Sequence, residues 1–332
     1  MFRYRQCALG PRSLRQLVNG PMQKEEATVL GGCQIRRGKI WRIAAVFAAS
    51  SALALSGCAS PDTSEPTEET TAATAEKVDA IANTVPEDIR STGKLVIGVN
   101  IPYAPNEFKD PSGKIVGFDV DLMNAIAATL GLTPEYREAD FAKIIPSIEG
   151  GTFNVGMSSF TDTKEREESV DFVTYFSAGT LWAQRPGSPV DPNNACGKKV
   201  AVQATTTQEQ EELPAKSKAC TDAGKPPIEI VSFDGQDAAT NAVVLGQADA
   251  VSADSPVTSY AIKQSNGKLE AAGEIFASAP YGWPVKQDSA LAESLKQALE
   301  HLIENGKYKE IATNWGVEAG MIDKPVINGA IS

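Results

Sequence analysis

Residues 94–137 contain KLVIGV (94–99), then GFDVDLMNAIAATLG (117–131), then TPEYR (133–137). The first segment is apolar and predicts a buried strand. The second has acids in its first turn and apolar residues at helical spacing, which predicts a helix that the final glycine ends. The third predicts another short strand. This order of strand, helix and strand is typical of a parallel sheet covered by helices.

The alternation continues along the chain and then restarts. A short helix is expected over 142–149 and a strand over 154–157, a second series of strands and helices begins at 198, and a long helical pattern covers 289–315. About 240 residues of globular composition exceed what one compact core usually holds. We therefore expect an α/β fold with two lobes, each a three-layer α/β sheet.

The N-terminal part of the chain resembles the leader of a bacterial lipoprotein. Basic residues at 36–42 precede the uncharged run 43–55, which is short for a membrane span and has the length of a signal-peptide core. It leads into LSGC (55–58), which resembles a lipobox whose Cys58 is acylated, for example with palmitate. The resemblance implies a lipoprotein signal peptide over 1–57 and an extracytoplasmic protein anchored to the cell membrane by lipid. A secretory signal followed by a chance cysteine is the open alternative.

The composition after Cys58 is first that of a linker. Residues 59–78 are rich in Ala, Ser, Pro, Thr and Glu and contain no aromatic residue, so they cannot build a core. We expect a flexible tether over 58–85 that links the lipid to the folded part.

The chain beyond the leader is strongly acidic. Residues 1–57 hold 9 of the 31 Lys and Arg and 2 of the 42 Asp and Glu, which leaves 22 basic and 40 acidic residues and a net charge of −18. This charge argues against nucleic acid as a partner, because the phosphates would be repelled.

Two cysteines remain beyond the lipobox, Cys196 and Cys220. In an exported domain such a pair is a disulfide candidate, and two independent buried thiols are the alternative. The chain has one histidine, His301, which lies on a helical pattern. The sequence therefore indicates no metal site, no cofactor and no catalytic arrangement of Ser-His-Asp or Cys-His type.

Five short motifs follow one another along the chain. They are GFDVDL (117–122), IPSIEGG (145–151), MSSFTDTKER (157–166), GKKVAVQ (197–203) and GKY (306–308). In this order they make the chain resemble the extracellular solute-binding proteins, family 3, of ABC transporters for polar amino acids. The resemblance extends over nearly all of 93–316.

The resemblance implies a two-lobe, periplasmic-binding-protein-like clamp of type II. Lobe 1 would comprise 86–185 together with 280–325, and lobe 2 would comprise 186–279. Two hinge crossovers are expected, near 184–188 and near 277–281. The ligand would lie between the lobes and be buried when they close.

The resemblance also implies which residues hold the ligand carboxylate and ammonium. Arg166 matches the family's carboxylate-binding arginine, whose planar fork suits that task, and Thr161 would donate beside it. Ser158 and Ser159 match positions whose main chain or hydroxyls accept from the ammonium. Asp254 matches the acid that pairs with the ammonium, and the alternative is an N-cap of the helix that follows.

The second lobe would contribute the turn QATTTQ (203–208), at a helix N-terminus that favours an anion. Thr206 is the expected contact to the carboxylate. Thr205 takes the place of the family's usual glycine, and a β-branched residue would be strained there if the turn requires a positive φ.

The pocket for the ligand side chain is implied at Asn100, Tyr103 and Phe141. Tyr103 and Phe141 match aromatic residues that stack on the ligand, although either could instead belong to the core. Asn100 lies where relatives specific for cationic amino acids often carry an acid. We therefore expect a neutral polar ligand such as glutamine first, a basic one second and an acidic one third.

The expected function is that of a monomeric binding protein without enzymatic activity. It would capture a free amino acid, close around it and deliver it to a transmembrane permease. A periplasmic dehydratase-type enzyme on the same fold is one alternative, with Asp140 or Glu107 as acid or base. A sensor lobe, or the binding half of a cell-wall lytic enzyme, is another.

Overall fold

The computed structural model describes residues 75–331. The expected signal peptide, the lipid site Cys58 and most of the expected tether lie outside the described residues. Among the residues that the structure describes, no helix is long and apolar enough to cross a membrane.

The strands are β1 (Lys94–Val99), β2 (Phe108–Lys109), β3 (Ile115–Val116), β4 (Thr133–Glu138), β5 (Val155–Gly156), β6 (Val170–Gln184), β7 (Lys199–Gln203), β8 (Glu229–Phe233), β9 (Ala250–Asp254) and β10 (Glu270–Lys286). The helices are α1 (Asp79–Ala82), α2 (Glu87–Arg90), α3 (Phe118–Thr129), α4 (Phe141–Glu149), α5 (Lys164–Glu167), α6 (Leu213–Asp222), α7 (Gln236–Val244), α8 (Ser255–Gln264), α9 (Leu291–Glu304) and α10 (Lys307–Trp315). A π-helical turn, η1 (Gln208–Glu212), precedes α6, and a short 3-10 turn, η2 (Glu318–Gly320), follows α10.

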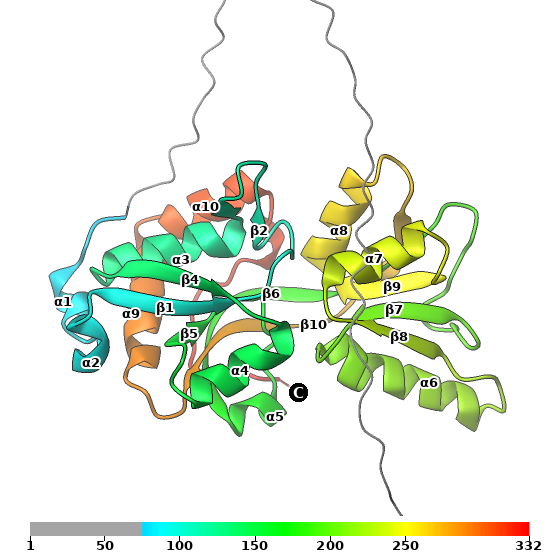
Figure 1. Cartoon of the computed structure of the whole chain (residues 1–332), viewed down its shortest axis with the longest axis horizontal. Coiled ribbons are helices and arrows are strands. Elements are labelled where there is room, and N and C mark those ends of the chain that lie inside the picture. Colours follow the sequence, from blue (N-terminus) through cyan, green and yellow to red (C-terminus); the bar gives the residue numbers. More distant parts are fainter. Residues whose placement is uncertain (1–74, 332) are drawn as a thin grey trace, which may run out of the picture. The chain divides into compact units, whose positions relative to one another are not determined.

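One sheet of eight strands, in the order β4-β1-β5-β10-β6-β9-β7-β8, runs through both lobes (Figure 1). We call the part around β4, β1 and β5 the first lobe and the part around β9, β7 and β8 the second lobe. Within each of these groups the strands are parallel. The expected fold, a two-lobe α/β clamp, is the observed one.

The lobes are joined by β6 and β10, a long antiparallel pair (Figure 1). Their register shifts between Phe276 and Ala279. From Thr180 onward β6 also pairs with β9 of the second lobe, so the chain has already crossed before residue 180. The first crossover expected at 184–188 is therefore placed too late, because β6 continues without a break through the point where the chain changes lobe.

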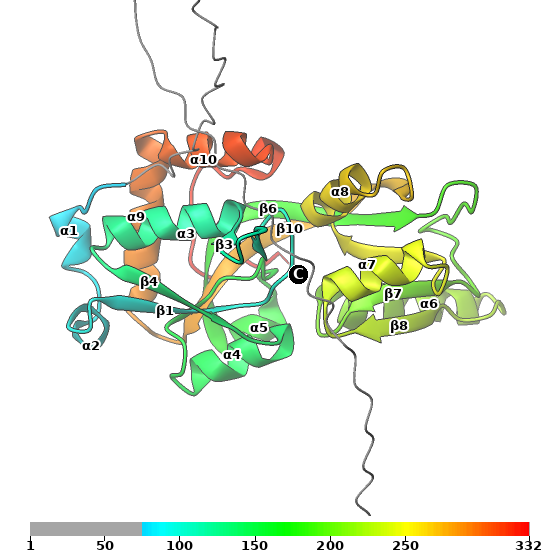
Figure 2. The same ribbon diagram turned by 45° about the horizontal axis from the view of Figure 1, so that its top comes forward.

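Each lobe has its own apolar core. In the first lobe, Ile97 of β1 packs in one cluster with Leu122 of α3 and Leu295 of α9, and Figure 2 shows α3 and α4 on opposite faces of the sheet. In the second lobe, Val202 and Leu213 belong to a cluster beneath α6, whereas separate residues on the other face pack beneath α7. Because no single core spans both lobes, β6 and β10 can act as the hinge between two packed bodies.

The folded part begins earlier than expected. Val78 donates its amide to Thr129 O (3.0 Å), Asp79–Ala82 form α1, and both Ala82 and Val85 are buried. The expected extension of the tether to residue 85 is therefore wrong, because apolar side chains before residue 86 pack on the first lobe. The same lobe also extends past residue 325, since Asn328 donates its amide to Phe172 O (2.9 Å).

The helical pattern over 289–315 forms two helices rather than one. Gly306, at a φ of 83°, separates α9 from α10. A side chain there would be strained in this left-handed conformation, and the glycine allows the chain to turn.

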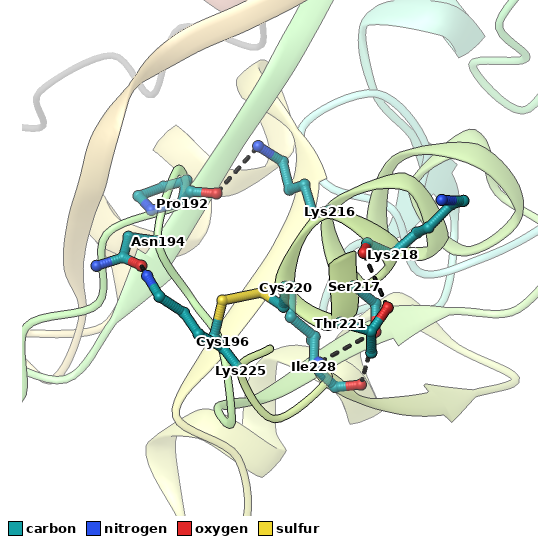
Figure 3. The surroundings of a disulfide bond; sticks show 10 residues. All are labelled: Pro192, Asn194, Cys196, Lys216, Ser217, Lys218, Cys220, Thr221, Lys225 and Ile228. Carbon is teal, nitrogen blue, oxygen red and sulfur yellow. Dashed lines mark hydrogen bonds between the residues drawn. A yellow bond between two sulfur atoms is a disulfide. The ribbon is translucent and has the colours of Figure 1, made fainter. Parts of the chain in front are cut away.

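The expected disulfide joins Cys196, which precedes β7, to Cys220 of α6 (Figure 3). The two Cα atoms are 5.5 Å apart. The alternative of two independent thiols is wrong. In the chain-entropy account, a bridge that closes a loop of this length stabilises a fold by about 3 kcal/mol.

Candidate ligand site between the lobes

A cavity between the two lobes is lined by every residue that the family resemblance assigned to ligand binding. The first lobe contributes Asn100, Tyr103, Phe141, Ser158, Ser159, Thr161 and Arg166. The second lobe contributes Gln203, Thr206, Thr207, Gln208 and Asp254. Three of these, Gln203, Thr207 and Gln208, had no role in the sequence analysis.

Arg166 lies on the short helix α5, whose N-cap, Thr163, accepts a hydrogen bond from the Arg166 amide (3.3 Å). Its guanidinium donates to Thr161 O (2.8 Å) and, from Nη2, to Thr205 O of the other lobe (3.0 Å). The guanidinium carbon lies 5.7 Å from the ring centre of Phe141 and 5.6 Å from that of Phe160. Burial lowers the pKa of Arg166, and the charge of Asp254 opposes that shift. The cation is therefore oriented by carbonyls and aromatic faces.

Asp254 ends β9 and is buried. Its Oδ2 accepts from the hydroxyls of Tyr103 and Tyr281, each at 2.7 Å, and its Oδ1 accepts from Gln208 Nε2 at 2.8 Å. Burial raises the pKa of Asp254, while these donors and the charge of Arg166 oppose the increase. Although Asp254 occupies the N-cap position of α8, its side chain makes no capping bond, so the alternative N-cap role is wrong.

The two expected aromatic residues differ in their surroundings. Tyr103 is buried, and its hydroxyl crosses the cavity to Asp254. Phe141 stacks on Phe160, with the ring centres 4.3 Å apart and the planes at 16°. Phe141 thus packs against a small apolar cluster and also lines the cavity, and its stacking on a ligand stays a prediction.

Ser158 and Ser159 direct their hydroxyls away from the cavity. Ser158 Oγ donates to Glu107 Oε1 (3.1 Å), and Ser159 Oγ donates to Asp119 Oδ2 (3.1 Å). Asn106 Nδ2 in turn donates to Ser159 Oγ (2.8 Å). Of the two possibilities for these serines, main chain or hydroxyl, this arrangement favours the main chain as the group offered to a ligand.

The turn of the second lobe has the positive φ at Thr205 that would strain a β-branched residue. Thr205 has a φ of 60°, and its amide donates to Glu209 Oε2 (2.5 Å). Thr206 Oγ1 donates to Gln203 O (2.7 Å) and accepts from the Glu209 amide (3.3 Å). The turn is thus held by its own polar groups and by those of the following helical turn.

Asn100 bridges to the second lobe. Its Oδ1 accepts from Gln203 Nε2 (2.8 Å), and its Nδ2 donates to Ala139 O (2.9 Å). Gln203 and Gln208 stood in the quoted turn motif, and Tyr281 stood in the segment that returns to the first lobe. No signal in the sequence identified their partners, because each bond joins residues far apart in the chain.

Comparison with known proteins relates these features to a family. Residues 95–318 match the model of the bacterial extracellular solute-binding proteins, family 3. The arginine-binding protein ArgT of Corynebacterium glutamicum is 42% identical over 246 residues, which are 74% of this chain and 81% of that protein.

Solved structures show the same architecture. An ancestral arginine-binding protein, bound to arginine, has a TM-score of 0.62 at 36% identity over 67% of this chain and 98% of that one. An ancestral arginine-binding protein bound to glutamine has a TM-score of 0.62 at 35% identity over 68% of this chain and 99% of that one. The ancestral amino acid-binding protein AncCDT-1, a precursor of cyclohexadienyl dehydratase, has a TM-score of 0.60 at 29% identity over 69% and 98%. These matches confirm the family resemblance and the type II clamp expected from the motifs.

Proposed function

The chain belongs to the bacterial extracellular solute-binding proteins, family 3, and we propose that it captures a free amino acid, arginine in the first place, for an ABC importer. One observation carries the proposal. Arg166 and Asp254, a cation and an anion, lie in the two walls of one cavity and belong to different lobes. This pair suits the two charges that every free amino acid carries.

In this mechanism Arg166 binds the ligand carboxylate together with Thr161 and Thr206. The ammonium binds Asp254 and the main chain at Ser158 and Ser159. Because these groups come from both lobes, a ligand completes its contacts only when the lobes are close together. Ligand binding therefore favours the closed form, which the permease would recognise.

We propose arginine as the ligand in place of the neutral amino acid that was expected first from Asn100. The reason is the 42% identity to an arginine-binding protein. The side chain would lie beside Tyr103 and Phe141 and reach the amides of Asn100 and Gln203, which offer carbonyl oxygens to a guanidinium.

We propose no catalytic step. Of the two acids considered for an enzyme, Asp140 is exposed and pairs with Lys143 (2.5 Å), and Glu107 is buried behind Ser158. Neither of them lines the cavity.

We also propose that the protein is a monomer anchored to the cell membrane by lipid at Cys58, which lies outside the described residues. Radiolabelled palmitate should enter the wild-type protein and not the Cys58→Ala variant, which should be released from membranes. Equal labelling of both would contradict this anchor.

The ligand is tested with the protein purified from membranes in mild detergent. Arginine, lysine, ornithine, histidine, glutamine, citrulline and glutamate are added one at a time during thermal unfolding. A ligand at about 100 times its dissociation constant stabilises the protein by about 2.7 kcal/mol, a shift that is easily measured. Stabilisation by arginine at the lowest concentration supports the proposal, and no stabilisation by any amino acid would contradict it.

A further inference from the structure

Residues 326–330, which we call the C-terminal strap, lie on the first lobe and outside the part of the chain that matches the family model. Thr174 of β6 donates its amide to Val326 O (2.9 Å), and Val326 donates its amide to Thr174 Oγ1 (2.9 Å). Asn328 donates its amide to Phe172 O (2.9 Å) and accepts from the Phe172 amide through Oδ1 (2.8 Å). The strap is therefore held against the beginning of β6 by four hydrogen bonds.

The strap then turns toward the short helix α5. Asn328 has a φ of 55°, a left-handed conformation that Asn adopts more readily than most residues. At Gly329 a Cβ atom would lie 2.6 Å from Val326 Cγ2 and 2.8 Å from Thr174 Cγ2, so glycine allows the close approach. The turn is followed by two successive amides, those of Gly329 and Ala330. Successive backbone N–H groups at a turn can bind anionic groups.

These two amides bind two carboxyl groups on either side of Arg166 in the chain. Gly329 donates to Asp162 Oδ2 (2.7 Å), and Ala330 donates to Glu167 Oε1 (3.0 Å). Asp162 lies just before α5, and Glu167 is the last residue of that helix. The strap therefore holds both ends of the four-residue helix that carries Arg166.

The carboxyl of Asp162 depends on the strap for its hydrogen bonding. Asp162 is buried, and among residues 75–331 the Gly329 amide is the one donor to its carboxyl, since Oδ1 has no partner. Burial raises the pKa of Asp162 to about 7, the bond from Gly329 opposes the increase, and the charge of Glu167 adds to it. Glu167 Oε2 pairs with Lys164 (2.8 Å), which leaves Oε1 to the strap.

The segment between the two carboxyls forms part of the cavity wall. Thr161 and Arg166 both line the cavity, and the Arg166 guanidinium donates to Thr161 O (2.8 Å). The Asp162 amide donates to Pro280 O of β10 (2.9 Å). The strand β10 thus fixes the backbone before α5, whereas the strap fixes the side chains at both ends of α5.

We propose that the C-terminal strap positions Arg166 for the ligand carboxylate, with Asp162 and Glu167 as the positioning residues through which it acts. The inference rests on the proposed function and adds an element from outside the family match. Neither carboxyl lines the cavity. A helix of one turn has few hydrogen bonds of its own, so contacts from outside must hold it in place. A guanidinium binds a carboxylate in a defined plane, and a displaced α5 would therefore bind the ligand less tightly.

The first test removes the strap and measures recognition of the carboxylate. A chain that ends at Pro325 is compared with the full chain in calorimetry with arginine and with argininamide, which has a neutral amide in place of the carboxylate. Arginine affinity should fall by at least about tenfold, because hydrogen bonds to the carboxyls that hold α5 are lost. Argininamide affinity should change much less, since argininamide does not form the charged pair with Arg166. An equal loss for both ligands, or no loss for arginine, would overturn the proposal.

Point variants separate positioning from a general loss of stability, and they serve even if the shortened chain does not fold. Asp162→Ala should lower arginine affinity by about tenfold. Asp162→Asn should restore it to within about threefold of the wild type, because the amide oxygen still accepts from Gly329. Lys164→Ala is the matched control, since it removes the ion pair with Glu167 Oε2 and leaves both bonds of the strap in place. An equal loss in the Ala and Asn variants would refute the role of the strap bond.

Hydrogen exchange followed by mass spectrometry tests the strap without a ligand. In Gly329→Ala, whose new methyl group displaces the strap, and in the shortened chain, peptides over 160–168 should exchange faster than in the full wild-type chain. Peptides over β1 should not change. Unchanged exchange over 160–168 would overturn the proposal. If the wild-type protein binds no amino acid, the proposed function itself fails, and the calorimetry reports that result separately from the exchange.

Discussion

The two walls of the cavity are built in different ways. In the first lobe, Ser158 and Ser159 are bonded to side chains that are buried behind them. In the second lobe, the turn around Thr205 has a strained backbone and bonds within itself, to Glu209 or across the cavity. Each wall has one non-glycine residue at positive φ, Ser159 (51°) and Thr205 (60°), so the walls differ in their support and not in backbone strain. A wall backed by a buried network is already arranged for its ligand, whereas a turn that is held mainly by its own polar groups can adjust when the clamp closes.

The largest expected effect tests the recognition group of the first wall. Arg166→Lys keeps the positive charge but loses the planar fork, so the affinity for arginine should fall by about a hundredfold, or roughly 3 kcal/mol, in calorimetry. Lys164→Ala is the control, because Lys164 is exposed on the same helix and pairs with Glu167. Near wild-type affinity in Arg166→Lys would mean that the first wall is not the carboxylate site.

The next effect concerns the stability of the second lobe, which contains the disulfide. Replacement of both Cys196 and Cys220 by alanine should lower the free energy of unfolding by about 3 kcal/mol in urea titrations. Hydrogen exchange followed by mass spectrometry should show faster exchange in β7 and α6 than in β1 and α3. Equal loss of protection in both lobes would contradict the separation of the two cores.

A smaller loss of arginine affinity is expected when either of the two tyrosines that donate to Asp254 is replaced. Tyr103→Phe removes a bond across the cavity, and Tyr281→Phe removes one that starts in the hinge strand β10. Each change should weaken arginine binding by about tenfold, because a hydrogen bond to a charged acceptor contributes about 1.5–3 kcal/mol.

The pH dependence of arginine binding separates a role of Tyr103 and Tyr281 in keeping Asp254 ionised from a purely structural role. A lost donor raises the pKa of Asp254 further, and only the ionised carboxylate binds an ammonium. As the pH falls, the affinity of both variants should therefore begin to decrease at a higher pH than that of the wild type. Parallel pH profiles for the three proteins would refute the role of these tyrosines.

The smallest effect probes the strain in the second wall. Thr205→Gly should raise the free energy of unfolding by about 1 kcal/mol, because a β-branched residue at positive φ is unfavourable. Thr207→Gly is the matched control, since Thr207 has a φ of −61° and its replacement should destabilise the protein by about 0.5–1 kcal/mol. A loss of stability in Thr205→Gly would show that the turn is not strained.

The prediction of the fold succeeded where local patterns are strong. The helix over Phe118–Thr129 and the strand Lys94–Val99 have the spacing of apolar residues that their buried faces require. The strands β6 and β10 were not predicted as such, because both serve two lobes. Residues such as Trp182 and Trp283 are buried in different cores although their strands are paired, so no single periodicity describes either strand.

The candidate site was predicted from motifs that resemble those of a family, and not from the physical properties of the individual residues. The motif around Arg166 and the acid at Asp254 identified residues that line one cavity in the structure. The bond partners of those residues were not predicted, because Tyr281 and Gln208 reach Asp254 from other parts of the chain. Glu107, considered in the sequence as an acid or base beside a substrate, is buried behind Ser158 and does not line the cavity.

The amino-acid sequence alone predicted the class of fold, the two cysteines of a candidate disulfide and the chemical types of the cavity residues. These depend on periodicity, composition and motif, which are local properties of the chain. The tertiary structure was needed for the buried oxygens of Glu107 and Asp119 that have no hydrogen-bond partner, the three donors on Asp254 and the positive φ of Thr205. Such features arise from distances and burial between residues remote in sequence, and those quantities exist only once the chain has folded.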